Sequence, residues 1–176
     1  MGKTEKKEKE KNRLAGSEGS GEGRDARGNG QGSAKVSKKE LIAGLNEDLA
    51  GEFNAVITYR LFASMCSGPW RQELRQFFES EIPDELGHAQ FLADKIVALG
   101  GTPITAPAPV DISNDNRRML EIVLQAERDT VRRYKTRAEQ ADALGEVALK
   151  VRLEDIIVDE THHAEEIERI LTNWKS

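Results

Sequence analysis

Two Glu-x-x-His segments carry the residues best suited to chemistry in this chain. Glu85 and His88 form the first segment, and Glu160 and His163 form the second, 75 residues further on. Residues three apart in a helix lie on one face, so each segment presents a carboxylate and an imidazole in the same direction. Nitrogen and oxygen ligands placed together in this way are typical of a metal site.

The same offset relates other residues, so the helical region is predicted to contain two copies of one helical hairpin. The further pairs are Glu52 with Glu127, Tyr59 with Tyr134, and Ile82 with Ile157. With the two additional glutamates the chain supplies four carboxylates and two imidazoles, the set with which a four-helix bundle holds two iron or manganese ions. One Glu-x-x-His segment alone would be weak evidence for a metal site, because charged helix faces are common. The absence of thiolate ligands favours these metals over a structural zinc ion.

Four helices are needed to position this set, and the sequence marks their ends. Ser37 and Glu40 form a capping-box pattern, which predicts a helix start at Lys38. Pro69 suits the first position of the second helix, and Gly100 the end of that helix. The expected helices span about residues 38–66, 69–99, 114–144 and 146–171.

Prolines mark two further features. Pro83 should kink the second helix because it removes a backbone hydrogen bond, and the bend is either simply tolerated or opens an entrance beside Glu81. Residues 101–113 contain three prolines and, when extended at about 3.1 Å per residue, could cross about 40 Å. This link predicts an all-α four-helix bundle with a long crossover between the second and third helices.

The chain divides by composition into a tail and a domain. Residues 1–37 contain eight of the 15 glycines and almost no large apolar side chains, which predicts a disordered tail, with the bundle in residues 38–174. The first 13 residues hold six Lys or Arg against three Glu. This tail is either a DNA-binding arm or a solubilising spacer. Without a long apolar stretch or signal peptide, a cytoplasmic location is expected.

Residues 38–174 resemble the ferritin-like di-iron proteins, and most of all bacterioferritin and the smaller Dps-like proteins with a bacterioferritin-type site. The resemblance rests on the ligand separations of 33, 42 and 33 residues and on motifs in all four predicted helices. These motifs are Leu45-Asn46, Glu52, Tyr59, Glu85, His88, Glu127, Tyr134, Glu160 and His163.

The resemblance implies a ferroxidase that oxidises Fe²⁺ with O₂ or H₂O₂, for iron storage, detoxification and protection against oxidative stress. It implies that Glu85 and Glu160 bridge two iron ions, with manganese as the alternative metal. Glu52, Glu127, His88 and His163 would be terminal ligands. Tyr59 would either donate a hydrogen bond to a ligand carboxylate or serve as a redox-active phenol.

The sequence departs from the bacterioferritin pattern at Leu86, where those proteins carry the haem-binding Met, so haem is not expected. Cys66 is the only cysteine, which argues against the rubredoxin module of many rubrerythrin-like peroxidases. Such a peroxidase, a manganese catalase and a DNA-binding nucleoid protein remain the alternatives. A homo-oligomer of 12 subunits is favoured because only 13 residues follow His163, with 24 subunits or a dimer as alternatives.

Overall fold

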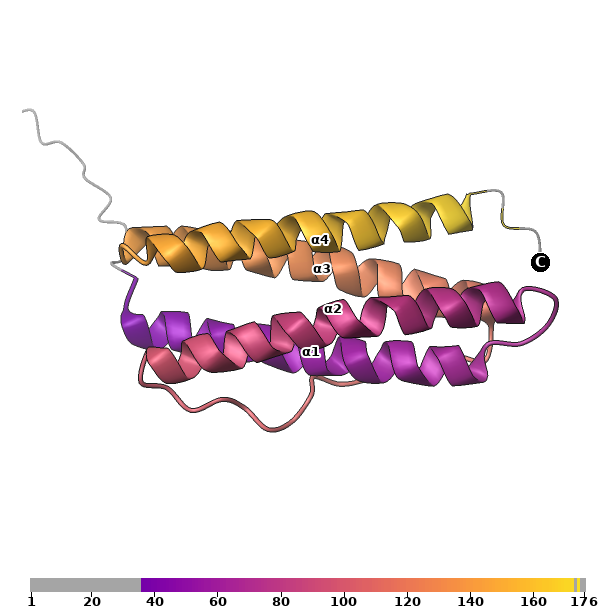
Figure 1. The fold of residues 1–176 in the computed structure, drawn as a ribbon, viewed down its shortest axis with the longest axis horizontal. Helices are drawn as coiled ribbons and strands as arrows, with labels where there is room; N and C mark the ends of the chain where they lie inside the picture. Colours follow the sequence, from indigo (N-terminus) through magenta and orange to yellow (C-terminus); the bar gives the residue numbers. More distant parts are fainter. Residues whose placement is uncertain (1–35, 173, 175–176) are drawn as a thin grey trace, which may run out of the picture. The chain divides into compact units, whose positions relative to one another are not determined.

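The computed structural model describes residues 36–172 and Trp174, and this part of the chain is helical without strands. The helices are α1 (Lys38–Met65), α2 (Arg71–Ala98), α3 (Asn116–Ala143) and α4 (Val147–Leu171). They form a four-helix bundle (Figure 1), which confirms the predicted fold class. Within these residues, no helix combines the length and the apolar composition that crossing a membrane requires. Residues 1–35 of the predicted tail lie outside the described residues, and the disorder and DNA binding of the tail stay predictions.

The start of α1 agrees with the capping-box pattern. The Ser37 hydroxyl accepts a hydrogen bond from the Glu40 amide, and the Glu40 carboxylate accepts one from the Ser37 amide at 2.7 Å. The predicted start of α2 is wrong by two residues. Pro69 lies in the preceding turn, because Gly68 adopts a positive φ of 75° and its carbonyl accepts from the Arg71 amide. The helix continues without interruption through Pro83.

The long crossover is attached along α1. Asn46 holds its beginning, donating to the Thr102 carbonyl and accepting from the Ile104 amide at 2.7 Å. Further along, Ala108 donates its amide to the Ala50 carbonyl at 2.8 Å. The link thus returns the chain to the opposite end of the bundle, and α3 runs parallel to α2 (Figure 1).

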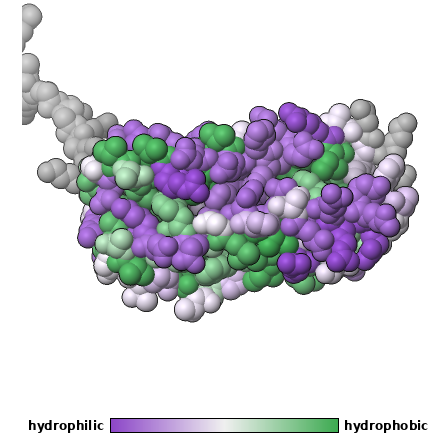
Figure 2. All heavy atoms as spheres, in the orientation of Figure 1, coloured by the Kyte–Doolittle hydropathy of each residue, from purple (hydrophilic) through white to green (hydrophobic). Residues whose placement is uncertain are grey.

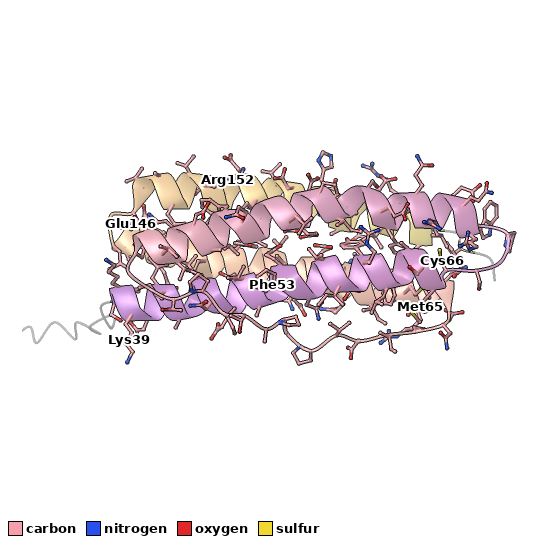
Figure 3. All side chains as sticks on the ribbon, turned by 60° about the horizontal axis from the view of Figure 1, so that its bottom comes forward. Lys39, Phe53, Met65, Cys66, Glu146 and Arg152 are labelled. Carbon is pink, nitrogen blue, oxygen red and sulfur yellow. The ribbon has the colours of Figure 1, made fainter. Side chains whose placement is uncertain are left out.

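The core consists of two apolar clusters near the two ends of the bundle. One contains the leucines at the start of α1, such as Leu45, with the end of α2 and the start of α4. The other contains Phe62 and Phe78 near the α1–α2 turn. Buried Cys66 belongs to this second cluster, and Figure 3 shows it at the opposite end of α1 from Lys39. The face of the molecule seen in Figure 2 is mainly hydrophilic with separate apolar patches.

A buried ion pair joins α1 to α3. Asp48 is fully buried and accepts a hydrogen bond from Nε of Arg137 at 2.7 Å. The Arg137 guanidinium fills the space beside Gly44, where a Cβ atom would overlap it. The sequence pattern alone does not predict this pair. The small residue on α1 is therefore what allows a cation on α3 to reach a carboxylate one turn further along α1.

We expect Gly44→Ala to destabilise the protein by about 1–3 kcal/mol, as is usual for overpacking. The new methyl group would displace Arg137 from buried Asp48, which outweighs a helix-propensity gain of about 1 kcal/mol. Urea unfolding measures the change. Gly87→Ala is the matched control, because Gly87 is exposed in α2 with open space around it. That control should stabilise, and equal stabilisation by both substitutions would contradict the packing argument.

Candidate metal centre

Each helix contributes to one polar cluster in the middle of the bundle. The contributing residues are Glu52 from α1, Glu85 and His88 from α2, Glu127 from α3, and Glu160 and His163 from α4. All six are buried, and none is more than 8% exposed. They lie between the two apolar clusters, so the structure brings together every residue of the predicted ligand set.

The six residues form two overlapping groups, each able to hold an ion. Within each group one atom per residue lies within 4.8 Å of every other such atom. The groups are Glu52, Glu85, His88 and Glu160, and Glu85, Glu127, Glu160 and His163. Glu85 and Glu160 belong to both groups. An arrangement in which two carboxylates are shared suits two adjacent cations.

Several inward atoms of this cluster have no hydrogen-bond partner. They are Oε1 of Glu85, both carboxylate oxygens of Glu160, and Nδ1 of His88 and His163. Nδ1 of His88 approaches Oε1 of Glu160 to 3.0 Å, and Nδ1 of His163 approaches Oε2 of Glu160 to 3.4 Å. These contacts bring charges together without the alignment of a hydrogen bond. Buried polar atoms are rarely left unpaired, and divalent cations would satisfy this set.

The outer nitrogens of both imidazoles face carboxylates from the neighbouring helix. Nε2 of His88 lies 3.5 Å from Asp159, whereas Nε2 of His163 lies 3.0 Å from Glu81 and 3.8 Å from Asp84. Metal-binding histidines usually donate their second N–H to such a group, which fixes the ring and increases its basicity. The spacing of the ligands alone does not predict this role for the aspartates, although the repeat of Asp84 at Asp159 is a signal for it in the sequence.

The two tyrosines of the repeat are equivalent in the structure. Tyr59 donates to Oε1 of Glu127 at 2.5 Å, and Tyr134 donates to Oε1 of Glu52 at 2.6 Å. Burial first, and then the neighbouring glutamate, raises the pKa of both phenols well above the usual range. Both therefore stay protonated and orient a carboxylate across the α1–α3 interface. This is one of the two roles considered for Tyr59.

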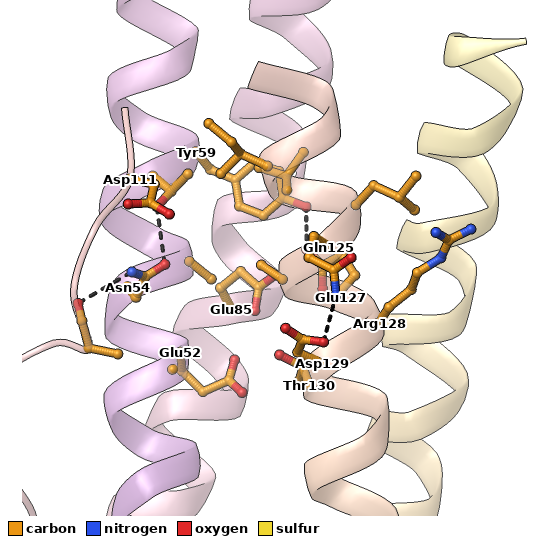
Figure 4. A pocket seen from close by; sticks show the side chains of 18 of the residues that line it. Glu52, Asn54, Tyr59, Glu85, Asp111, Gln125, Glu127, Arg128, Asp129 and Thr130 are labelled. Carbon is orange, nitrogen blue, oxygen red and sulfur yellow. Dashed lines mark hydrogen bonds between the residues drawn. The ribbon is translucent and has the colours of Figure 1, made fainter. Parts of the chain in front are cut away.

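The cluster is reached from two sides. A cleft of about 660 Å³ between α1 and α3 is lined by Glu52, Glu85 and Glu127, with Arg133 and the crossover residue Pro109 among its other lining residues. Figure 4 shows the three glutamates side by side in this cleft.

A second opening lies between α2 and α4, and Glu81, Asp84, Asp159 and His163 are among its lining residues. Glu81 thus stands beside an opening. His162 is exposed, although it lies next to buried His163 in α4.

Comparisons with known proteins agree with this geometry. The family model for the ferritin-like domain matches residues 42–176. The chain belongs to the ferritin-like family. Bacterioferritin from Streptomyces coelicolor is 28% identical to it over 130 residues, covering 73% of this chain and 78% of that protein. Bacterioferritin BfrA from Mycobacterium tuberculosis is 30% identical over 130 residues, covering 73% and 82%.

Solved structures show the same relationship. A ferritin-like, di-iron-carboxylate protein from Bacillus anthracis is 55% identical, with a TM-score of 0.75, covering 76% of this chain and 96% of that one. Rhodobacter capsulatus bacterioferritin is 25% identical, with a TM-score of 0.70, covering 76% and 84%. Together with the carboxylate–histidine cluster, these ferritin-like relatives support iron binding.

Crowding of acidic groups changes the protonation of this ferritin-like site. Burial, and then the charges of nearby glutamates, raises the pKa of Glu85 and Glu127 well above the usual range. Burial lowers the pKa of His88, but Glu160, Glu52 and Glu85 outweigh it and raise the pKa to about 12. Burial raises the pKa of Glu160, but the imidazoles of His163 and His88 that face it outweigh burial and lower this pKa. Without metal, protons on the imidazoles therefore supply the compensating positive charge.

We expect divalent metal binding to release at least one proton near pH 7, because His88 must lose its proton to become a ligand. Because the pKa of His88 is raised to about 12, the imidazole retains its proton below about pH 12 when no metal is bound. Metal affinity should therefore rise with pH. Titration calorimetry with Mn²⁺ in two buffers of different ionisation enthalpy measures the release. Equal enthalpies in both buffers would contradict this prediction.

Proposed function

We propose that the protein is a ferroxidase that oxidises Fe²⁺ at the buried cluster and so serves iron storage and detoxification. The observation that supports this most directly is the pair of overlapping ligand groups that share Glu85 and Glu160. A carboxylate that belongs to both groups has two oxygens and can therefore serve two neighbouring cations at once. Four carboxylates and two imidazoles in a helical bundle are the ligand set of ferritin-like di-iron proteins.

The chain would hold one ion with Glu52 and His88 and the other with Glu127 and His163, with the shared carboxylates between them. Two Fe²⁺ ions give up one electron each. Hydrogen peroxide would take both electrons and two protons to form two waters, whereas O₂ would take the same number to form hydrogen peroxide. The ligand set leaves both oxidants open.

The surrounding residues have defined tasks in this proposal. Tyr59 and Tyr134 orient the two unshared glutamates through short hydrogen bonds. Asp159 lies 3.5 Å from Nε2 of His88 and Glu81 lies 3.0 Å from Nε2 of His163, and these carboxylates would keep Nδ1 of each histidine directed inward. The two apolar clusters limit water to the openings, and carboxylates at the α2–α4 opening attract divalent cations. No Met stands at Leu86, and we expect protein without haem.

Glu127→Ala and His88→Ala should each slow aerobic Fe²⁺ oxidation by at least about tenfold, because direct ligands matter at least as much as the groups that orient them. Stopped-flow absorbance, with O₂ and separately with H₂O₂, measures the rate. Glu139→Ala is the control, since Glu139 is exposed on α3. Oxidation at the control rate in both ligand variants would refute the proposed function.

Mn²⁺ should stabilise the folded protein, because it would bind the native cluster and not the unfolded chain. At a hundredfold excess over the dissociation constant the expected gain is about 2.7 kcal/mol. Thermal unfolding followed by circular dichroism should show a higher Tm with Mn²⁺ than with a chelator. A variant with Ala at both Glu85 and Glu160 should lose this difference. A Tm insensitive to Mn²⁺ in the unaltered protein would argue against metal binding.

A further inference from the structure

The internal repeat matches at the ligands but differs around them. We define the first half of the centre as Glu52 with His88, and the second half as Glu127 with His163. The 75-residue offset places Glu81 opposite Ile156, Asp48 opposite Val123, and Arg137 opposite Phe62. Each of these pairs sets a charged residue against an apolar one. All three differences lie close to the metal centre, so the two halves have equal ligands in unequal surroundings.

The first difference lies at the outer nitrogens of the histidines. Glu81 contacts His163 at 3.0 Å, and its side chain is 15% exposed. The partner of His88 is Asp159, at 3.5 Å and 47% exposed. A closer and less solvated carboxylate acts more strongly on the imidazole it faces. His163 should therefore be the more strongly electron-donating ligand of the two.

The second difference lies on the α1–α3 side. One turn before Glu52, buried Asp48 is bonded to Arg137, and Nε of half-buried Arg133 lies 3.6 Å from the same carboxylate. A second anion, Glu47, lies 3.8 Å from Arg137, but its side chain is 75% exposed and screened by water. Among the buried and half-buried groups, two cations therefore face one anion. The equivalent surrounding of the second half is apolar, because Phe62 and Val123 pack in one cluster. Nearby positive charge disfavours a divalent cation in the first half.

We infer that the two metal positions are unequal and that the first divalent cation binds in the second half, with Glu127 and His163. This inference rests on the proposed metal-binding function. Both differences act in the same direction: Glu81 adds negative charge beside the second half, and the two arginines add positive charge beside the first. The α2–α4 opening is lined by His163, so a cation entering there also meets the second half first. Glu81 acts here as a positioning residue for His163.

Mn²⁺ is a suitable probe because it binds carboxylate and imidazole ligands and is stable in air. The full chain is crystallised with less than one equivalent of Mn²⁺, and anomalous scattering locates the ion. Density mainly between Glu127 and His163 is the expected result. Equal density in both positions, or more in the first half, would overturn the inference. If neither position shows density under saturating Mn²⁺, the proposed metal-binding function itself would be overturned.

Calorimetric titration of the same protein should show two binding steps. Glu81→Gln should weaken the first step by about tenfold or more, as for the loss of a carboxylate that orients a metal-binding histidine, with a smaller change in the second step. Glu79→Gln is the matched control: it removes the same charge from α2, and Glu79 bonds to Arg75 at the surface. Equal effects of the two variants, or an unchanged first step in Glu81→Gln, would contradict the role of Glu81.

Discussion

Four carboxylates buried together are the constraint on which the rest of this structure depends. Glu52, Glu85, Glu127 and Glu160 are each at most 3% exposed, and isolated charges in such surroundings are strongly unfavourable. Two imidazoles are the only cationic side chains within the cluster, and their inward nitrogens lack hydrogen bonds. The bundle tolerates this arrangement because its stability comes from the apolar clusters on either side. Cations are what the arrangement requires.

The long crossover follows from the same requirement. Two hairpins can each supply a carboxylate and a Glu-x-x-His pair, but the ligands meet only if the hairpins pack with their middles level. A link fixed to α1 by Asn46 and Ala50 returns the chain to the end from which the second hairpin can start in register. Tyr59 and Tyr134 then join the hairpins directly, since each donates to a glutamate of the other.

The sequence predicts the fold and the six clustered residues because both depend on spacing along helices. Residues three apart share a face whatever surrounds them, and a proline-rich segment remains extended. The Asp48–Arg137 pair could not be predicted in this way, because it depends on the space that Gly44 leaves between two distant helices. The contact of Glu81 with His163 depends likewise on how closely α2 and α4 approach. The predicted start of α2 was wrong because Gly68 closes a turn before the helix begins.

The internal repeat explains why the ligands are symmetric and why their surroundings need not be. In the proposed two-metal site each ion takes one further carboxylate and one imidazole from one hairpin, and this requirement keeps those positions alike in both halves. Residues one helical turn away from the ligands only have to fill space and balance charge. The apolar side chains of Phe62 and Val123, which belong to one cluster, fulfil that requirement in one half, and the Asp48–Arg137 pair fulfils it in the other. The second solution places ionic groups, with Arg133 close to Asp48, one turn from Glu52, whereas apolar side chains occupy the equivalent positions near Glu127. The two equal sets of ligands therefore differ in their electrostatic surroundings.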